Sequence, residues 1–226
     1  MNMEKLVIGD KEIPYSVKTG TSKRYVYFHF KPNLELEIIM PRSTKLRAED
    51  IIQKKKTLIE RKYTELTNRK KVYTDNQLMY KGKYYSIKVL PIPDEGKGRV
   101  KVQGDEILVF TNNHEDKMPA IRQWMKRQTE QHLKRNINKY ANKFGISLSK
   151  FYVWDTKRWG YCNKKGELVF NWQLIALPKE LVDYVINHEI THLLEFNHST
   201  NFHKRLASLY PDFREKENVL KNIIPI

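Results

Sequence analysis

In the first half of the chain, apolar residues alternate with polar ones or form short runs. This pattern is typical of β-strands, and Gly, Asn and Asp bound several of the stretches. An amphipathic stretch with a heavily basic face predicts a helix over residues 48–70. The expected strands cover residues 12–17, 24–30 and 34–40, and pairs of strands joined by turns are expected near residues 77–91 and 98–111. The first half is therefore expected to be rich in strands.

Helical periodicity dominates the second half. Apolar residues recur at near-helical spacing over residues 116–143, which predicts a long helix that ends before Gly145. The other expected elements are helices over residues 178–195, 200–209 and 212–221 and short strands over residues 151–155 and 167–172. We find no internal repeat in the sequence. The order of elements predicts an α+β fold with a strand-rich basic region, residues 1–115, followed by a compact region, residues 116–226.

The net charge of +16 over 226 residues is large and unevenly distributed. Residues 148–226 contain 11 Lys and Arg against 9 Asp and Glu, so nearly all the excess precedes them. A basic N-terminal region of this kind could bind nucleic acid weakly, or attract nucleotides or acidic substrates. A solvated lysine-rich surface is the favoured alternative, because Lys outnumbers Arg and no nucleic-acid motif is present.

Cysteine content and hydropathy suggest the compartment. Cys162 is the only cysteine, so no internal disulfide can form, and it is expected to be a small buried apolar residue. No apolar run is long enough to span a membrane, and the N-terminus has no apolar signal core. We therefore expect a cytoplasmic protein with no membrane partner.

The strongest indication of function is the stretch His-Glu-Ile-Thr-His at residues 188–192. On a helix, His188 and His192 lie one turn apart on the same face and can bind one metal ion. Glu189 lies beside that face, where a general base is needed. A chance match on an amphipathic helix is the alternative, but two histidines and a glutamate on a mostly buried helix are costly unless a partner binds them.

A catalytic zinc ion usually has three protein ligands, so the chain must supply one more. Asn197 tolerates a left-handed C-cap, and His198 follows at once, which makes it the first choice for third ligand. Glu195 and His203 are weaker candidates. Metzincin proteases need a methionine turn after their histidines, and it is absent because the last methionine is Met125.

Residues around this stretch resemble the YgjP-like metallopeptidase-domain family, which is related to the SprT-like and WLM zincins. The resemblance is loose over the N-terminal strands and close over residues 120–210. The segments that carry it are Arg158-Trp159-Gly160-Tyr161-Cys162, Leu168–Ile175, Asp183–His192 and Asn197-His198-Ser199 with Phe202. Tyr161 stands where the family usually has serine, and His203 where it usually has tryptophan.

The resemblance implies a compact zincin-like core with a strand-rich region packed beside it. It also implies that one Zn²⁺ is held by His188, His192 and His198, with Glu189 as catalytic base. Zincins commonly bind an extended peptide along an edge strand, and the strand from Leu168 to Trp172 is our candidate for that edge. The alternative is that Trp159 and Trp172 are core aromatic residues.

The expected activity is zinc-dependent hydrolysis, most simply of peptide bonds. Two alternatives remain open: a zinc hydrolase that cleaves the phosphoanhydride bond of nucleotides, and a DNA-recruited protease like those of the SprT-like group. The substrate is accordingly a polypeptide or a nucleotide. Candidates for contacting the substrate or the transition state are Arg158, Trp159, His203, Arg205 and Tyr210.

Overall fold

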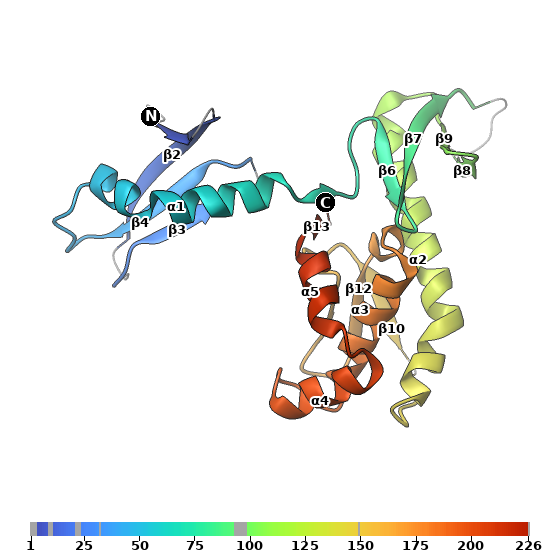
Figure 1. Cartoon of the computed structure of the whole chain (residues 1–226). Coiled ribbons are helices and arrows are strands. Elements are labelled where there is room, and N and C mark those ends of the chain that lie inside the picture. Colours follow the sequence, from blue (N-terminus) through green and yellow to red (C-terminus); the bar gives the residue numbers. More distant parts are fainter. Residues whose placement is uncertain are drawn as a thin grey trace. The chain divides into compact units, whose positions relative to one another are not determined.

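The computed structural model describes residues 4–8, 11–20, 24–31, 33–92, 99–148 and 150–225. The chain divides into two compact units, Met1–Arg69 and Lys70–Ile226 (Figure 1). The mixture of helices with several small sheets confirms the α+β expectation. The boundary expected between a strand-rich region, residues 1–115, and a second region, residues 116–226, stays a prediction.

The first unit is a four-stranded sheet followed by one helix. Its elements are β1 (Glu4–Ile8), β2 (Lys11–Gly20), β3 (Tyr27–Phe30), β4 (Leu36–Pro41) and α1 (Ala48–Thr67). The strand order is β1-β2-β4-β3, with β2 and β4 parallel and the two outer pairs antiparallel. Its core contains Ile13, Leu36 and Ile38 of the sheet with Ile52 and Ile59 of the helix.

The second unit begins with the same arrangement. Its elements are β5 (Lys70–Lys71), β6 (Gln77–Tyr80), β7 (Lys83–Leu90), β8 (Arg99–Gln103), β9 (Glu106–Phe110), the 3₁₀ turn η1 (His114–Asp116) and α2 (Lys117–Asn142). The sheet order is β6-β7-β9-β8, with β7 and β9 parallel and the outer pairs antiparallel. Four strands of one topology followed by a long helix therefore occur twice in this chain.

The repeat extends to the register of the two central strands. Ser16 pairs with Glu37 in the first sheet, and Ser86 pairs with Glu106 in the second. The sequence Tyr-Ser-Val-Lys at residues 15–18 corresponds to Tyr-Ser-Ile-Lys at residues 85–88. The conclusion from sequence that no internal repeat exists was therefore wrong, and this four-residue match was the signal that could have found it.

The rest of the second unit is a small sheet covered by helices. Its elements are β10 (Phe151–Trp154), β11 (Gly160–Cys162), β12 (Leu168–Asn171), the 3₁₀ turn η2 (Leu174–Ala176), α3 (Lys179–Thr191), α4 (Thr200–Leu209), α5 (Phe213–Lys221) and β13 (Ile223–Ile224). The sheet order is β10-β12-β11, so β12 is the central strand. The expectation that the strand from Leu168 is a free edge was wrong, because β10 and β11 occupy its two sides; the edges are β10 and β11.

Two sets of contacts position α3 within the second unit. In the tight turn between β6 and β7, the backbone N–H groups of Lys81 and Gly82 donate hydrogen bonds to the carbonyls of Ile175 and Ala176, at 3.0 and 2.8 Å respectively. On the other side, α2 packs against α3, and the Tyr140 hydroxyl donates to the Asp183 carboxylate at 2.5 Å. The start of α3 is thereby held against the repeated sheet and its helix.

One continuous core fills the second unit. Its fully buried side chains include Leu78, Ile121, Met125, Phe170 and Phe202. Trp172 is 4% exposed within this core and Trp159 packs partly buried against it, as the alternative of core aromatic residues predicted. No helix among the described residues has both the length and the apolar character needed to cross a membrane.

Candidate metal centre

Helix α3 carries the first histidine and the glutamate of the His-Glu-Ile-Thr-His stretch. His188 lies in its last turn, and His192 follows directly as the C-cap, with its backbone N–H donating to the His188 carbonyl at 3.3 Å. The two rings lie 5.1 Å apart between centroids, as one-turn spacing requires. Both imidazoles therefore face the same side of α3.

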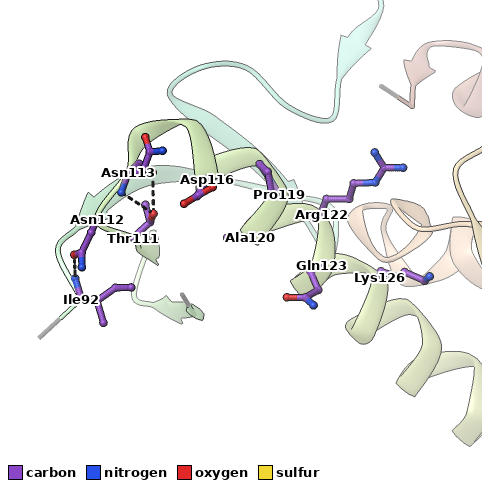
Figure 2. Close-up of a pocket in the computed structure, with 10 residues that line it drawn as sticks. All are labelled: Ile92, Thr111, Asn112, Asn113, Asp116, Pro119, Ala120, Arg122, Gln123 and Lys126. Carbon is purple, nitrogen blue, oxygen red and sulfur yellow. Dashed lines mark hydrogen bonds between the residues drawn. The ribbon is translucent and has the colours of Figure 1, made fainter. Parts of the chain in front are cut away.

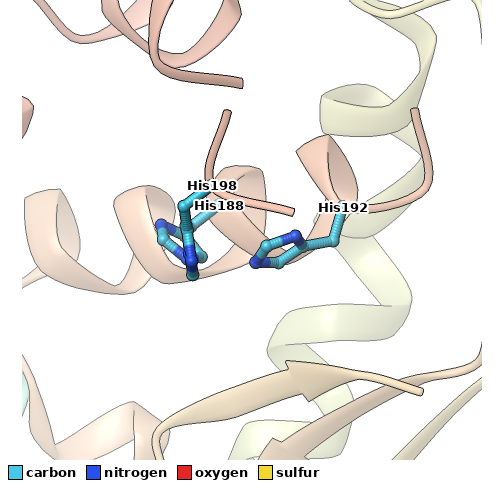
Figure 3. A group of neighbouring side chains, drawn as sticks. All are labelled: His188, His192 and His198. Atoms are coloured by element: carbon cyan, nitrogen blue, oxygen red, sulfur yellow. The ribbon is translucent and has the colours of Figure 1, made fainter. Parts of the chain in front are cut away.

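The chain turns sharply after His192 and returns toward the same face. The Glu195 N–H donates to the Thr191 carbonyl at 2.9 Å, which closes the turn. His198 then places its Nε2 atom 3.1 Å from Nε2 of His188. One ligand atom from each of His188, His192 and His198 lies within 4.8 Å of the others, and the three rings converge in Figure 3.

This turn corrects the predicted end of the helix. The helix was expected to reach residue 195 with Asn197 as a left-handed cap, but α3 ends at Thr191. Leu34 and Lys81 are the non-glycine residues with positive φ in the described part of the chain, so Asn197 is not left-handed. A longer helix would carry the chain about 1.5 Å farther along its axis with each residue. The early end allows His198 to return to His188.

Phe202 supports the three rings from α4. Its side chain is fully buried, and its ring centroid lies 5.0 Å from that of His188, 4.6 Å from His192 and 4.7 Å from His198. The Ser199 hydroxyl caps α4 by accepting from the Phe202 N–H at 3.2 Å. The residue after His198 thus starts the helix that places Phe202 beneath the histidines.

The Nδ1 atoms of two histidines have partners away from the site. Nδ1 of His188 lies 3.3 Å from the Tyr184 hydroxyl, which donates to the Glu217 carboxylate at 3.1 Å. Nδ1 of His192 lies 3.2 Å from the Glu195 carbonyl. Partners of this kind select the tautomer that leaves Nε2 as the metal-binding atom.

These three residues fit a divalent metal. Tetrahedral coordination with Zn–N bonds of about 2.0–2.1 Å separates ligand nitrogens by about 3.4 Å, close to the His188–His198 separation. Burial, together with the neighbouring histidines, lowers the pKa of His188 to about 3. Burial likewise lowers the pKa of His192. Both imidazoles are therefore neutral near pH 7, which is the form that binds metals.

Glu189 is buried beside the histidines. Its side chain is 7% exposed, and burial raises its pKa to about 8, against the opposing effects of the Cys162 backbone hydrogen bond and the positive charge of Arg158. Gly160 lies against it: a Cβ atom at Gly160 would sit 2.9 Å from Cγ of Glu189. Strand β11 can approach α3 this closely only because residue 160 has no side chain.

A pocket of about 390 Å³ joins these groups to the edge strand β11. It is lined by Arg158, Gly160, Tyr161, Cys162, His188, Glu189, His192, Phe196 and His198. The pocket therefore brings together three imidazoles, a buried carboxylate, a guanidinium and a strand edge.

Among the predicted substrate-contacting residues, Arg158 lines this pocket and the other four do not. Trp159 packs into the core, and the Nδ1 atom of His203 lies 2.9 Å from the Ser199 carbonyl. Arg205 pairs with the Glu195 carboxylate at 3.2 Å. The Tyr210 hydroxyl accepts from the Asn187 side chain at 3.1 Å, next to the Tyr184 ring. These residues brace the elements that carry the histidines.

Three lining residues were not expected at the site, and Cys162, expected to be a small buried apolar residue, is only partly buried. Tyr161 and Cys162 belong to β11, and Phe196 lies at the pocket with its side chain 55% exposed. Burial raises the pKa of the Cys162 thiol, which favours its neutral form. An aromatic residue between the polar residues Glu195 and Asn197, two places before His198, was the signal that could have indicated Phe196.

Comparison with known proteins returns one similarity. A family described as YgjP-like, metallopeptidase domain, matches residues 24–223. No curated protein and no solved structure matches the chain.

Proposed function

The chain belongs to the YgjP-like metallopeptidase-domain family, and from this premise we propose that it is a zinc-dependent peptidase with a zincin-like catalytic core. The family suggests a metal-dependent hydrolase. The observation that carries the proposal further is the convergence of three imidazoles beside a buried carboxylate. In this proposal His188, His192 and His198 hold the metal, and Glu189 is the general base.

A bound zinc ion would polarise the scissile carbonyl and make the attacking water more acidic. The positive charge of a bound metal would favour the ionised form of Glu189, and this carboxylate takes the proton of that water and later gives it to the leaving amine. The Cys162 N–H, which donates to this carboxylate, orients it between the two tasks. The low exposure of Glu189 keeps competing water away from the carboxylate.

Arg158 and β11 supply the remaining functions. Arg158 is the cationic side chain at the pocket, and it can stabilise negative charge that develops on the carbonyl oxygen. Strand β11 pairs with β12 on one side and borders the pocket on the other. An extended substrate can add to this edge by backbone hydrogen bonds, which would place its scissile bond near Glu189.

The test of function compares two substrate classes on one preparation. Purified protein is incubated with an unfolded polypeptide such as casein and, separately, with nucleoside triphosphates. Each reaction is run with zinc, with a chelator, and with zinc restored after chelation. We expect cleavage of the polypeptide that stops with chelator and returns with zinc. Zinc-dependent release of phosphate from nucleotides without peptide cleavage would overturn the peptidase assignment.

Gly160→Ala is expected to lower kcat by about tenfold to a hundredfold. The added methyl group would press on Cγ of Glu189, and displacing a catalytic group by about 1 Å can cost this much. Steady-state kinetics with metal analysis measures the effect, and zinc content should stay unchanged because no histidine is touched. An unfolding midpoint measured in parallel separates misplacement of Glu189 from loss of folded protein. Unchanged kcat in a fully folded variant would contradict the assigned role of Gly160.

A further inference from the structure

The solvent-facing side of α2 is strongly and almost uniformly basic. The helix contains seven Lys and Arg against a single acid, Glu130. From Arg122 to Asn142, every exposed side chain is a cation or an amide. The exposed set is Arg122, Gln123, Lys126, Arg127, Gln131, Lys134, Arg135, Asn138, Lys139 and Asn142, which we call the α2 face. Its apolar residues lie on the other side, in the core.

Few of these cations are neutralised within the second unit. Arg122 pairs with Asp155 at 2.5 Å, while no carboxylate of the described residues lies within 4.0 Å of Lys126, Arg127, Lys134, Arg135 or Lys139. Clustered cations repel one another, and an anion bound along the helix would relieve this repulsion. The α2 face thus combines high charge with free donors.

Helix α1 holds the corresponding place in the first copy of the repeat and differs in this respect. It contains five Lys and Arg against four acids. Lys62 and Arg69 both pair with the Glu65 carboxylate, at 2.8 and 2.9 Å. The basic surface was expected within residues 1–115. The unpaired cations of the α2 face lie outside that region.

The composition of the α2 face favours one class of partner. Protein interfaces are centred on aromatic and aliphatic residues, and none is exposed from Arg122 to Asn142. Arg, Lys, Asn and Gln are the side chains that contact phosphate oxygens of nucleic acids. A helix of 26 residues is about 39 Å long, enough to follow several successive phosphates.

A hollow of about 730 Å³ lies at the N-terminal end of the α2 face. Figure 2 shows Arg122 and Lys126 on α2, with Asn112 and Asn113 on the loop that precedes it. Each asparagine uses its side-chain oxygen as an acceptor: Asn112 accepts from the N–H of Ile92, which follows β7, at 2.8 Å, and Asn113 accepts from the N–H of Glu115 in its own loop at 3.0 Å. Their amide N–H groups remain as donors beside the two cations, with Asp116 as the one acid of the lining.

We propose that the α2 face binds nucleic acid through its phosphate backbone, without reading bases. The absence of exposed aromatic residues on the α2 face argues against base stacking as the source of affinity. The inference is independent of the proposed peptidase activity, because none of its residues lines the metal pocket.

The test measures binding of the full chain to a fluorescein-labelled 20-base-pair DNA duplex, and to its single strand, by fluorescence anisotropy. The α2 variant carries Lys126→Gln, Lys134→Gln and Arg135→Gln. The matched control carries Lys54→Gln, Lys55→Gln and Lys56→Gln on α1, which are also exposed and remove the same net charge. Binding is measured from about 50 to 300 mM salt.

We expect the α2 variant to bind at least about tenfold more weakly and the control to bind within about twofold of the unmodified chain. Each lost phosphate contact should reduce the slope of log K against log salt by about 0.7–0.9, so three contacts remove about two to three. The proposal holds whether the unmodified chain binds the duplex or the single strand more tightly. The ratio of the two affinities identifies the preferred form.

Three results would overturn the proposal. Equal loss in the two variants would mean that net charge alone drives binding. No binding by the unmodified chain at micromolar concentration and low salt would exclude the α2 face as a nucleic-acid-binding surface. Equal affinity for poly-glutamate at matched charge, or for vesicles of anionic lipid, would show that the partner is not nucleic acid.

Discussion

Glu189→Gln is expected to lower peptide hydrolysis by about 10²–10⁴-fold while zinc stays bound. Glutamine keeps the size of the side chain but cannot accept the proton of the attacking water. The three histidines that would hold the metal are untouched, and the side-chain amide oxygen introduced by the substitution can still accept from the Cys162 N–H. The measurement is kcat with a peptide substrate, together with zinc content of the purified protein.

A matched control is available on the same helix. Glu180 lies at the start of α3 and is exposed, so Glu180→Gln makes the same chemical change away from the pocket. Its kcat should stay within about twofold of the unmodified value. Full activity of Glu189→Gln with zinc bound would exclude Glu189 as the general base. Loss of zinc from this variant would instead point to a ligand role.

Phe202→Ala is expected to lower the free energy of unfolding of the second unit by about 3–5 kcal/mol. The ring is fully buried and contacts all three histidine rings, so its removal leaves a cavity beneath the candidate metal centre. Urea unfolding followed by tryptophan fluorescence measures the change. All four tryptophans lie after residue 70, so this signal reports on the second unit alone.

The experiment is run on metal-free protein, because metal binding would add its own stabilisation to the native state. Phe196→Ala is the control: it removes the same ring from a side chain that is 55% exposed, and should cost less than about 1 kcal/mol. Equal losses of unfolding free energy in the two variants would mean that the buried position of Phe202 beneath the histidines adds no stability beyond that of an exposed ring.

The helices were predictable because each has a one-sided apolar pattern long enough to be recognised. The expected helix over residues 200–209 coincides with α4, and the one over residues 116–143 differs from α2 by one residue at each end. Strand β1 was missed. It has five residues, and only Leu6 and Ile8 are buried, which is too short a pattern to identify from sequence.

The sheet around β12 shows a different limit. All four residues of β12 are buried. A strand is buried in this way when neighbouring strands cover both its sides and other elements cover both its faces. The sequence reveals such a run but not which strands flank it. Strand β11 has three residues with a glycine at one end, so nothing in its pattern identifies it as the strand beside the pocket.

The candidate site was predictable where chemistry depends on local spacing. His188, Glu189 and His192 are fixed relative to one another by one helical turn, and His198 follows after a short loop. Arg158 reaches the pocket because β11, which follows it, packs against α3, and sequence spacing does not fix that contact. The same reasoning explains the basic surface: charges can be counted in a sequence, but their ion-pair partners depend on the fold.

The duplicated arrangement of four strands and a helix also affects how the chain reaches its native state. Two tandem modules with the same strand order and matching registers offer each other alternative partners, and strand exchange between neighbours is a characteristic misfolding route of repeated domains. The first module can form before the second is synthesised, which removes its strands from competition. Divergence between the copies acts in the same direction, because strands of different sequence are poorer substitutes for one another.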